Sequence, residues 1–480
     1  MSNRSSGILL HPTSLPETPG IGTIGKQAYK FVDWLASAKQ TLWQILPIGP
    51  TGYGDSPYAS FSTFAGNPLM IDLDMLKENG WISAEQIAPP DYIKSSGYVD
   101  FGSVVWWKIP VLKTAASQFL DSCKKEDRDA YEAFKNDNAS WLDNYAIFMS
   151  IKEFYDAKAK EEDRFGAMWS NYWPKELATF QPKAVSKWHE EHVKETEVHK
   201  VIQYFFFSQW KKLKEYANSK GISIVGDIPI FVASDSADVW ANQKLFQLDA
   251  DGRSTAVAGV PPDYFSATGQ LWGNPLYDWD AMKKTGYKWW IDRIRAMLSV
   301  VDYVRIDHFR GFEAYWSVPA GEETAINGKW VPGPDHALFN KIKEELGDIP
   351  VIAEDLGVIT DGVAALRDDF ELPGMKVLQF AFDVAEEKDL IRKYLGGCTP
   401  GVTISDEQLC PALIRAAFAS VAKFAVIPMQ DIFAIGSEGR MNVPSTTGGI
   451  NWQWRMTPEM FSDEKAQWLK EMSVLYGRNA

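Results

Sequence analysis

The 480-residue sequence has little of several features that mark whole classes of protein. It has three cysteines (Cys123, Cys398 and Cys410), which are too few and too scattered for a disulfide framework or a zinc ribbon. It lacks the run of ~20 apolar residues that a membrane-spanning helix needs, and its first residues show no signal-peptide pattern. We therefore expect a soluble, cytoplasmic protein.

Positive charge is also scarce. Lys and Arg number 49 against 63 Asp and Glu, which gives a net charge of −14. Nucleic acids and anionic membrane surfaces are bound through clustered Lys and Arg, so neither partner is expected.

Two patterns in the sequence look like cofactor or metal motifs, but neither has the context that such a motif requires. Gly20-Ile-Gly22-Thr-Ile-Gly25 has the letters of a dinucleotide fingerprint, but it follows a Pro-rich loop and not a strand. His189, His192 and His199 share one helical face without forming a His-Glu-x-x-His motif, which is typical of a solvated charged face. We expect neither a cofactor nor a metal.

Tryptophan, in contrast, is plentiful, with 20 in the chain. Flat aromatic faces stack on sugar rings, although packing in the core is the simpler explanation. The remaining composition, 45% apolar and 23% charged, is that of an ordinary globular protein with enough material for a large core.

Short apolar runs alternate with helix-like segments along most of the chain. The runs are near-continuous in Ile, Val, Leu and Phe, which is the pattern of parallel strands covered on both faces. Such alternation predicts an α/β protein with a parallel sheet, closed or open. The seven runs are Gly7 to His11, Thr41 to Ile48, Ile222 to Ile230, Val301 to Asp307, Ile349 to Glu354, Met375 to Asp383 and Phe424 to Asp431.

Two long stretches interrupt this alternation. Residues 72–200 are rich in Trp, Lys and Glu and read as a helical subdomain inserted between the second and third strands. Residues 232–277 are punctuated by Gly and Pro and read as a long active-site loop region, since loops of that length are usually functional. We expect the whole chain, 1–480, to form one catalytic domain around the sheet.

Two strand ends carry the residues of a glycosidase-type site. In Arg305-Ile-Asp307-His308, residues i and i+2 of a strand share a face, so Arg305 and Asp307 would point into the same site. The guanidinium would keep Asp307 ionised, as a nucleophile must be. Glu354 ends the next strand and could lie ~5 Å away, the spacing of a retaining pair. Burial and the neighbouring charge would raise the pKa of Glu354 and suit it to acid/base work. The simpler alternative is a structural ion-pair network.

At this point the sequence resembles the 4-α-glucanotransferases, also called amylomaltases or disproportionating enzymes, of the α-amylase clan. The resemblance covers about nine tenths of the chain. It implies a (β/α)8 TIM-type barrel with helical insertions, with Asp307 as nucleophile and Glu354 as acid/base. The matching motifs are Gly7-Ile-Leu-Leu-His11-Pro-Thr-Ser-Leu-Pro16, Gly52-Tyr-Gly-Asp55-Ser-Pro-Tyr58, Phe64-Ala-Gly-Asn67-Pro, Gly226-Asp227-Ile-Pro-Ile, Gly259-Val-Pro-Pro-Asp263-Tyr-Phe265-Ser, Trp272-Gly-Asn-Pro-Leu-Tyr277, Gln430-Asp431 and Arg440-Met-Asn442.

The resemblance also implies the glucan contacts. The Gly259–Ser266 loop is similar to the family's mobile loop over the acceptor groove, and the last loop, Ser445 to Trp452, carries an extra residue. No cofactor is implied, the partners are α-1,4-glucans and maltooligosaccharides, and a monomer is expected. The expected substrate-binding residues are Tyr58, Asp227, Gln270, Trp272, Arg305, His308, Phe265 and Asn451.

One departure from the family concerns the chemistry. The family has a His-Asp-Asn-Asp stretch on its seventh barrel strand, whose first Asp is a third catalytic carboxylate. Here Asp383 runs directly into Val384-Ala-Glu-Glu, and no strand-like run follows before Phe424. We therefore expect a barrel that lacks one strand. The function predicted is a 4-α-glucanotransferase of impaired activity. The alternatives are a glucan-binding protein with little or no catalysis, and a natural chain with a segment that this sequence omits.

Overall fold

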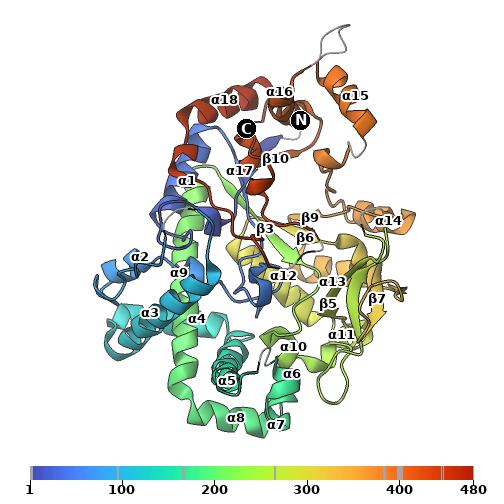
Figure 1. Cartoon of the computed structure of the whole chain (residues 1–480). Coiled ribbons are helices and arrows are strands. Elements are labelled where there is room, and N and C mark those ends of the chain that lie inside the picture. The colour runs from blue at the N-terminus through green and yellow to red at the C-terminus, as the bar shows by residue number, and fades with distance from the viewer. Residues whose placement is uncertain are drawn as a thin grey trace.

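A computed structural model describes residues 4–94, 97–164, 168–263, 266–381, 385–396, 404–444, 446 and 448–478. Its centre is a parallel sheet of six strands in the order β10-β1-β2-β3-β6-β9 (Figure 1). The strands are β1 (Ser5–Leu9), β2 (Leu42–Gln44), β3 (Ser223–Pro229), β6 (Tyr303–Asp307), β9 (Val351–Ala353) and β10 (Phe424–Pro428). The first and last strands of the chain are neighbours in this sheet.

The strand positions confirm the predicted α/β class. Six of the seven predicted runs form this sheet, and their apolar residues are buried on both faces, as in β3, where Ile224 and Ile228 are fully buried. β1 and β2 approach closely at Gly7, where a Cβ atom would lie 2.3 Å from the carbonyl oxygen of Leu42. Glycine is therefore required at that position.

The sheet is curled. Tyr303 in β6 and Phe424 in β10 are far apart in the strand order, yet their ring centroids are 5.3 Å apart. The sheet therefore bends round until these strands face each other, as in a half-barrel. Within the described ranges, no strand lies between its two outer strands, β9 and β10.

The predicted strand from Met375 to Asp383 is wrong wherever the structure describes it. Residues 375–377 are irregular, and Leu378–Ala381 form a short 3-10 helix, η6; 382 and 383 lie outside the described residues. The segment starts beside β9, since the Ala353 N–H donates to the Pro373 carbonyl at 2.8 Å. A buried strand needs hydrogen-bonding neighbours, and the described residues supply none on the far side.

Helices cover the outside of the sheet (Figure 1). Those between β2 and β3 are α2 (Leu73–Glu78), α3 (Phe101–Ser122), α4 (Lys125–Asp137), α5 (Leu142–Glu161), α6 (Trp169–Tyr172), α7 (Lys175–Ala178), α8 (Pro182–Glu191) and α9 (Val193–Ser219). The others are α1 (Lys26–Ser37), α10 (Ala237–Ala241), α11 (Trp279–Lys284), α12 (Lys288–Val300), α13 (Asp335–Leu346), α14 (Asp361–Asp369), α15 (Ala385–Leu395), α16 (Asp406–Ala419), α17 (Met429–Ile432) and α18 (Asp463–Leu475). No helix among the described residues is long and apolar enough to cross a bilayer.

The core explains most of the tryptophan. Trp43, Trp210 and Trp290 are among the largest fully buried side chains. The Trp210 indole N–H donates to the carbonyl of Val300 at 2.7 Å, which fastens α9 to the end of α12. Packing therefore accounts for many of the indoles and leaves a few for the cleft described below.

The stretch 232–277, expected as a long loop, contains regular structure. It includes α10 and two strands of a separate antiparallel sheet of order β5-β4-β7-β8. These strands are β4 (Ala256–Val260), β5 (Gln270–Pro275), β7 (Ala314–Pro319) and β8 (Lys329–Pro332). β4 pairs with β7, which comes after β6 in the sequence, and this non-local pairing has no local signal. The sheet stands beside the carboxyl ends of β3 and β6 and carries Trp272.

Arg478 ties the end of the chain to its beginning. Its fully buried guanidinium donates to the carbonyl oxygens of Phe418 at 2.7 Å, Ser420 at 2.9 Å, Ala422 at 3.0 Å and Ser5 at 3.1 Å. One side chain therefore joins β1 to the turn between α16 and β10.

We expect Arg478→Met to lower the free energy of unfolding by about 3 kcal/mol, because several buried carbonyls lose a charged donor at once. Urea unfolding followed by tryptophan fluorescence measures the change. Arg415→Met, which removes an exposed guanidinium from α16, is the control and should leave the unfolding midpoint in place. Equal midpoints for the two variants would contradict this role for Arg478.

Candidate active site

Three adjacent strands bring the predicted ionisable residues to one edge of the sheet. In the pairing of β3 with β6, Asp227 lies opposite Arg305, and Pro229 lies opposite Asp307. β6 pairs with β9 up to Ala353, so Glu354 follows at the same edge. Parallel strands that end in register therefore assemble residues that are distant in the sequence.

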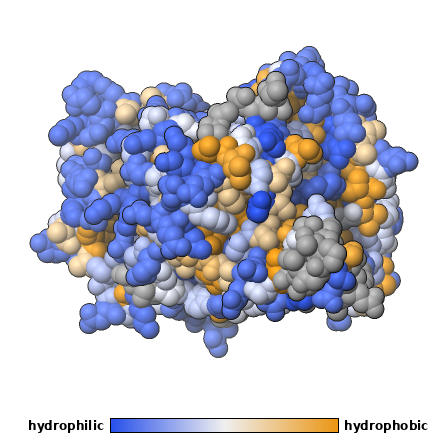
Figure 2. All heavy atoms as spheres, turned by 90° about the horizontal axis from the view of Figure 1, so that it is seen from above, coloured by the Kyte–Doolittle hydropathy of each residue, from blue (hydrophilic) through white to orange (hydrophobic). Residues whose placement is uncertain are grey.

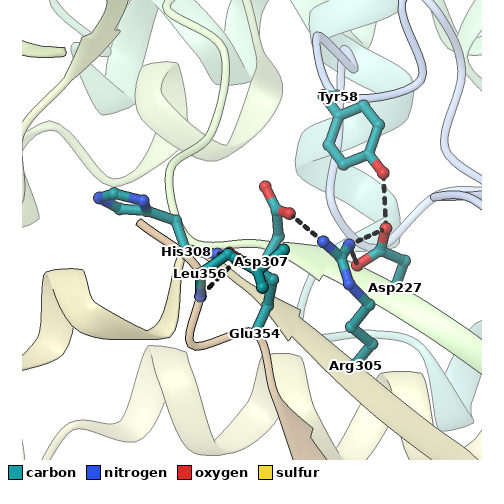
Figure 3. Close-up of polar contacts among 7 residues, drawn as sticks. All are labelled: Tyr58, Asp227, Arg305, Asp307, His308, Glu354 and Leu356. Carbon is teal, nitrogen blue, oxygen red and sulfur yellow. Dashed lines mark hydrogen bonds and ion pairs between the residues drawn. The ribbon is translucent and has the colours of Figure 1, made fainter. Parts of the chain in front are cut away.

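Arg305 lies at the centre of this group (Figure 3). Its guanidinium contacts Asp307 Oδ1 at 2.6 Å and both oxygens of Asp227 at 2.7 and 2.8 Å. The predicted common face of Arg305 and Asp307 is therefore confirmed. The adjacent carboxylates raise the pKa of Arg305 well above its usual range even though burial opposes the charge. The guanidinium stays charged and holds both carboxylates.

Tyr58 extends the group from a loop after β2. Its hydroxyl donates to Asp227 Oδ2 at 2.7 Å. Burial and the adjacent Asp227 charge raise the pKa of Tyr58, so the phenol stays protonated. Burial raises the pKa of Asp227 to about 6, while Arg305 opposes that shift. Asp227 is therefore ionised at neutral pH and saturated with donors.

Glu354 is fixed by backbone donors. The His308 N–H donates to one carboxyl oxygen at 2.6 Å, and the Leu356 N–H donates to the other at 2.9 Å. The residue is 8% exposed, and this burial, followed by the charge of Asp307, raises its pKa to about 7. The predicted rise and its causes are confirmed. A carboxyl group with this pKa can give up and take back a proton near neutral pH.

His308 and Trp272 form the side of the site next to the second sheet. His308 has a left-handed backbone (φ 53°), a strained conformation that turns its N–H towards Glu354. Burial lowers the pKa of its imidazole to about 4, so the ring is neutral. Its centroid is 4.8 Å from that of Trp272, whose indole N–H donates to Gln270 Oε1 at 3.1 Å. Gln270 thus orients Trp272.

Of these residues, Tyr58, Trp272 and Asp307 line a cleft of about 860 Å³. Its wall includes Tyr58, Phe231, Trp272, Asp307 and Trp452. Figure 2 shows hydrophobic residues gathered in the middle of the face seen from above, between mostly hydrophilic rims. Aromatic faces beside an ionised carboxylate suit a carbohydrate, whose rings stack and whose hydroxyls need polar partners.

Trp452 is a cleft residue that the sequence did not single out. Its ring lies 5.7 Å from that of Tyr58, and its backbone is left-handed (φ 68°), a genuine outlier for a bulky residue. The two residues come from opposite ends of the chain, which the pairing of β1 with β10 brings together. No local pattern could have indicated this contact.

One predicted binding residue does not join this group. The Asn451 side chain accepts from the Val443 N–H at 2.9 Å and donates to Thr446, so its amide holds its own loop. Phe265 lies outside the described residues. Among the described residues, no cluster of three or more His, Cys, Asp or Glu side chains could hold a metal ion.

Known proteins resemble this chain over its whole length. A family model described as 4-alpha-glucanotransferase matches residues 10–399 and 385–461. The 4-alpha-glucanotransferase of Thermus thermophilus is 45% identical, over 98% of each chain. The amylomaltase from Streptococcus agalactiae in complex with acarbose superimposes with a TM-score of 0.92 and 36% identity, over 99% of each chain.

The alignments also contain positions that this chain does not fill. The 4-alpha-glucanotransferase of Streptococcus pneumoniae is 43% identical over 510 aligned positions that cover 100% of this chain and 98% of the relative. Because this chain has 480 residues, at least 30 of those positions face a gap in it (510 − 480). The family match also divides into two pieces that meet at 385–399. This overlap lies between Asp383 and Phe424, where the sequence has no strand-like run for the eighth strand that a closed barrel needs.

We expect the pKa of Glu354 to fall in an Asp307→Asn variant, because the repulsive charge is gone while the burial remains. It should still exceed the ordinary value of 4.5. Carboxyl infrared difference spectra over a pH series measure it, with a further Glu354→Gln change to assign the band. An unchanged or higher pKa would mean that Asp307 does not act on Glu354.

Proposed function

Because the chain belongs to the 4-alpha-glucanotransferase family, we propose that it moves segments of α-1,4-glucan from one maltooligosaccharide or starch-like chain to another, with retention of configuration. One observation carries the chemistry. Asp307, held by Arg305, lies beside a buried carboxyl group, that of Glu354, whose pKa is about 7. The amylomaltase neighbour in complex with acarbose supports a glucan as the occupant of the cleft.

In the first half-reaction, the Asp307 carboxylate attacks the anomeric carbon of the donor glucan. Glu354 gives its proton to the departing glycosidic oxygen, so the shortened glucan leaves as an alcohol. A glycosyl ester on Asp307 and a Glu354 carboxylate remain. Arg305 orients Asp307, since hydrogen bonds to two carboxylates fix its guanidinium.

In the second half-reaction, the 4-hydroxyl of an acceptor sugar attacks the same carbon. Glu354 takes the hydroxyl proton and Asp307 is released, so two inversions give net retention. All acid, base and nucleophile groups are side chains, so the reaction needs no cofactor. The acceptor sugar, and not water, attacks the anomeric carbon where aromatic walls bind the sugar and exclude solvent.

The remaining predicted residues act as glucan contacts in this proposal. Trp272 and Tyr58 offer aromatic faces, and His308 offers a neutral ring beside Glu354. Asp227 and Gln270 position Arg305 and Trp272 respectively. The Gly259–Ser266 loop, with Phe265, is assigned to the acceptor side.

The alternative, a glucan-binding protein without catalysis, has no support in the site or among the relatives. A binding protein has no need of a carboxyl group held at a pKa of about 7 beside an ionised partner. The relatives that match the full chain are 4-alpha-glucanotransferases.

We expect the parent chain to convert maltotriose into a ladder of longer and shorter maltooligosaccharides, read by thin-layer chromatography. Asp307→Asn should reduce this transfer at least ~10⁴-fold, because it removes the nucleophile. Its maltooligosaccharide affinity, measured by calorimetry, should stay within a few fold because the cleft is intact. Glucose and maltose alone would indicate a hydrolase, and near-parental turnover in the variant would exclude Asp307 as the nucleophile.

We further infer that the chain is a (β/α)8-type barrel without its seventh strand. Three observations support this inference: the gap of at least 30 aligned positions, the divided family match at 385–399, and the unpaired β9 and β10 edges among the described strands. The segment that the gap removes is the one that would carry the family's His-Asp-Asn-Asp stretch. The third carboxylate, which would stabilise an oxocarbenium-like transition state, is then absent.

Inserting the corresponding Streptococcus pneumoniae segment at the gap should therefore speed transfer about 10²–10³-fold, the effect of one preorganised electrostatic group, equal to roughly 2.7–4 kcal/mol. The insert should also raise the melting temperature, because β9 and β10 gain partners. Initial transfer rates and calorimetric melting of the two chains measure both effects. A second insert, in which the first Asp of that stretch is changed to Asn, keeps the added strand but removes the carboxylate. It therefore separates the effect of the charge on the rate from the effect of the strand on stability. Equal rates with and without the insert would show that this carboxylate is dispensable here.

A further inference from the structure

The imidazole of His11 lies in the cleft and takes no part in the chemistry above. We infer that its Nε2 atom hydrogen-bonds a hydroxyl of the bound glucan. His11, which lies just after β1, is therefore a specificity-determining residue. This inference rests on the proposed function, since it names a further contact of the same site.

The ring is buried without a protein partner. His11 follows β1 and precedes the 3-10 helix η1 (Pro12–Ser14), is 6% exposed, and contributes to the wall of the cleft. Its Nδ1 atom is buried and has no hydrogen-bond partner, and neither ring nitrogen takes part in a hydrogen bond with a described residue. Nε2 is not among the buried unpaired atoms, so it is the ring nitrogen that a ligand in the cleft can reach and pair with.

A second buried histidine shows the ordinary arrangement. His199 in α9 is also 6% exposed, but its Nε2 atom pairs with Glu153 at 3.1 Å. His11 has no such acceptor. Burial lowers its pKa to about 3, so the ring is neutral and carries a single proton. With no acceptor beside Nδ1, that proton is better placed on Nε2, which can then donate to a sugar oxygen.

The surroundings favour a sugar at this position. Ser14 donates to the carbonyl of Trp454 at 2.7 Å, and the Met456 N–H donates to the carbonyl of Ser14 at 2.9 Å, so η1 is fastened to the loop that carries Trp452. Trp452 and Tyr58 form an aromatic pair on the cleft wall. Aromatic rings take the apolar face of a glucose unit, and its edge hydroxyls then need polar partners such as Nε2.

The first test separates binding from packing. His11→Phe keeps a flat ring and removes both nitrogens. We expect the KM for maltotetraose transfer to rise about tenfold, the effect of one hydrogen bond, with a smaller change in kcat. The melting temperature should not fall, because an unpaired buried nitrogen is replaced by carbon. In the matched control, His199→Phe, the melting temperature should fall while KM stays unchanged. A fall in melting temperature with no change in KM for His11→Phe would overturn the inference.

The second test identifies the hydroxyl. Calorimetric affinities of monodeoxy maltotetraoses are compared in Asp307→Asn chains with and without His11→Phe, so that no turnover occurs. In the chain that has His11, one deoxy analogue should bind about tenfold more weakly than maltotetraose. In the His11→Phe chain, the same analogue and maltotetraose should bind equally well, since the two changes remove the same contact. Equal losses in both chains for every analogue would overturn the inference and leave the proposed function standing. Failure of the parent chain to bind or transfer maltotetraose would overturn both.

Discussion

The site depends on one constraint: carboxylates of like charge can share the buried edge of a sheet only if a cation lies between them. Arg305 supplies that charge, with Asp227 on one side and Asp307 on the other. The register of β3 and β6 places the guanidinium there, because Asp227 lies opposite Arg305. Glu354, one strand further on, receives backbone N–H groups in place of a cation. Burial and the charge of Asp307 raise the pKa of Glu354 even though these donors and Arg305 oppose the rise, so two carboxyl groups in different surroundings acquire different roles.

The fold was predictable where its signal is local. A buried parallel strand has to be apolar along its length, and six such runs were located and form the sheet. The predictions failed where structure depends on a distant partner. Met375 begins an equally apolar run, yet the chain forms η6 there because β9 supplies a neighbour on one side only. β4 and β5 lie in a Gly- and Pro-rich stretch and are strands because they pair with each other and because β4 also pairs with the distant β7.

The site, too, has features that local sequence predicts and features that depend on distant parts of the chain. The common face of Arg305 and Asp307 follows from strand geometry, and the raised pKa of Glu354 follows from burial beside a charge, so both were predictable and are confirmed. Contacts between loops were not predictable. The ring of Trp452 reaches the cleft through a strained backbone that no residue pattern encodes. Asn451, one residue earlier, was expected at the substrate but uses its amide to hold the loop.

An opening lies between β9 and β10, the outer strands of the sheet among the described residues. Two strands in the described part of the sheet present edges without a strand partner, and a contact of 3.1 Å between Gln379 Nε2 and Asp431 Oδ2 spans the two sides at the carboxyl end. A single partly exposed hydrogen bond stabilises by ~1 kcal/mol, far less than a strand paired on both sides. Arg305 and Asp307 lie on β6, which is paired on both sides by β3 and β9, and two backbone N–H groups hold Glu354, so the acid and the nucleophile keep their geometry. In the function that we propose, the opening therefore bears on the stabilisation of transition-state charge and not on the groups that make and break the glycosidic bond.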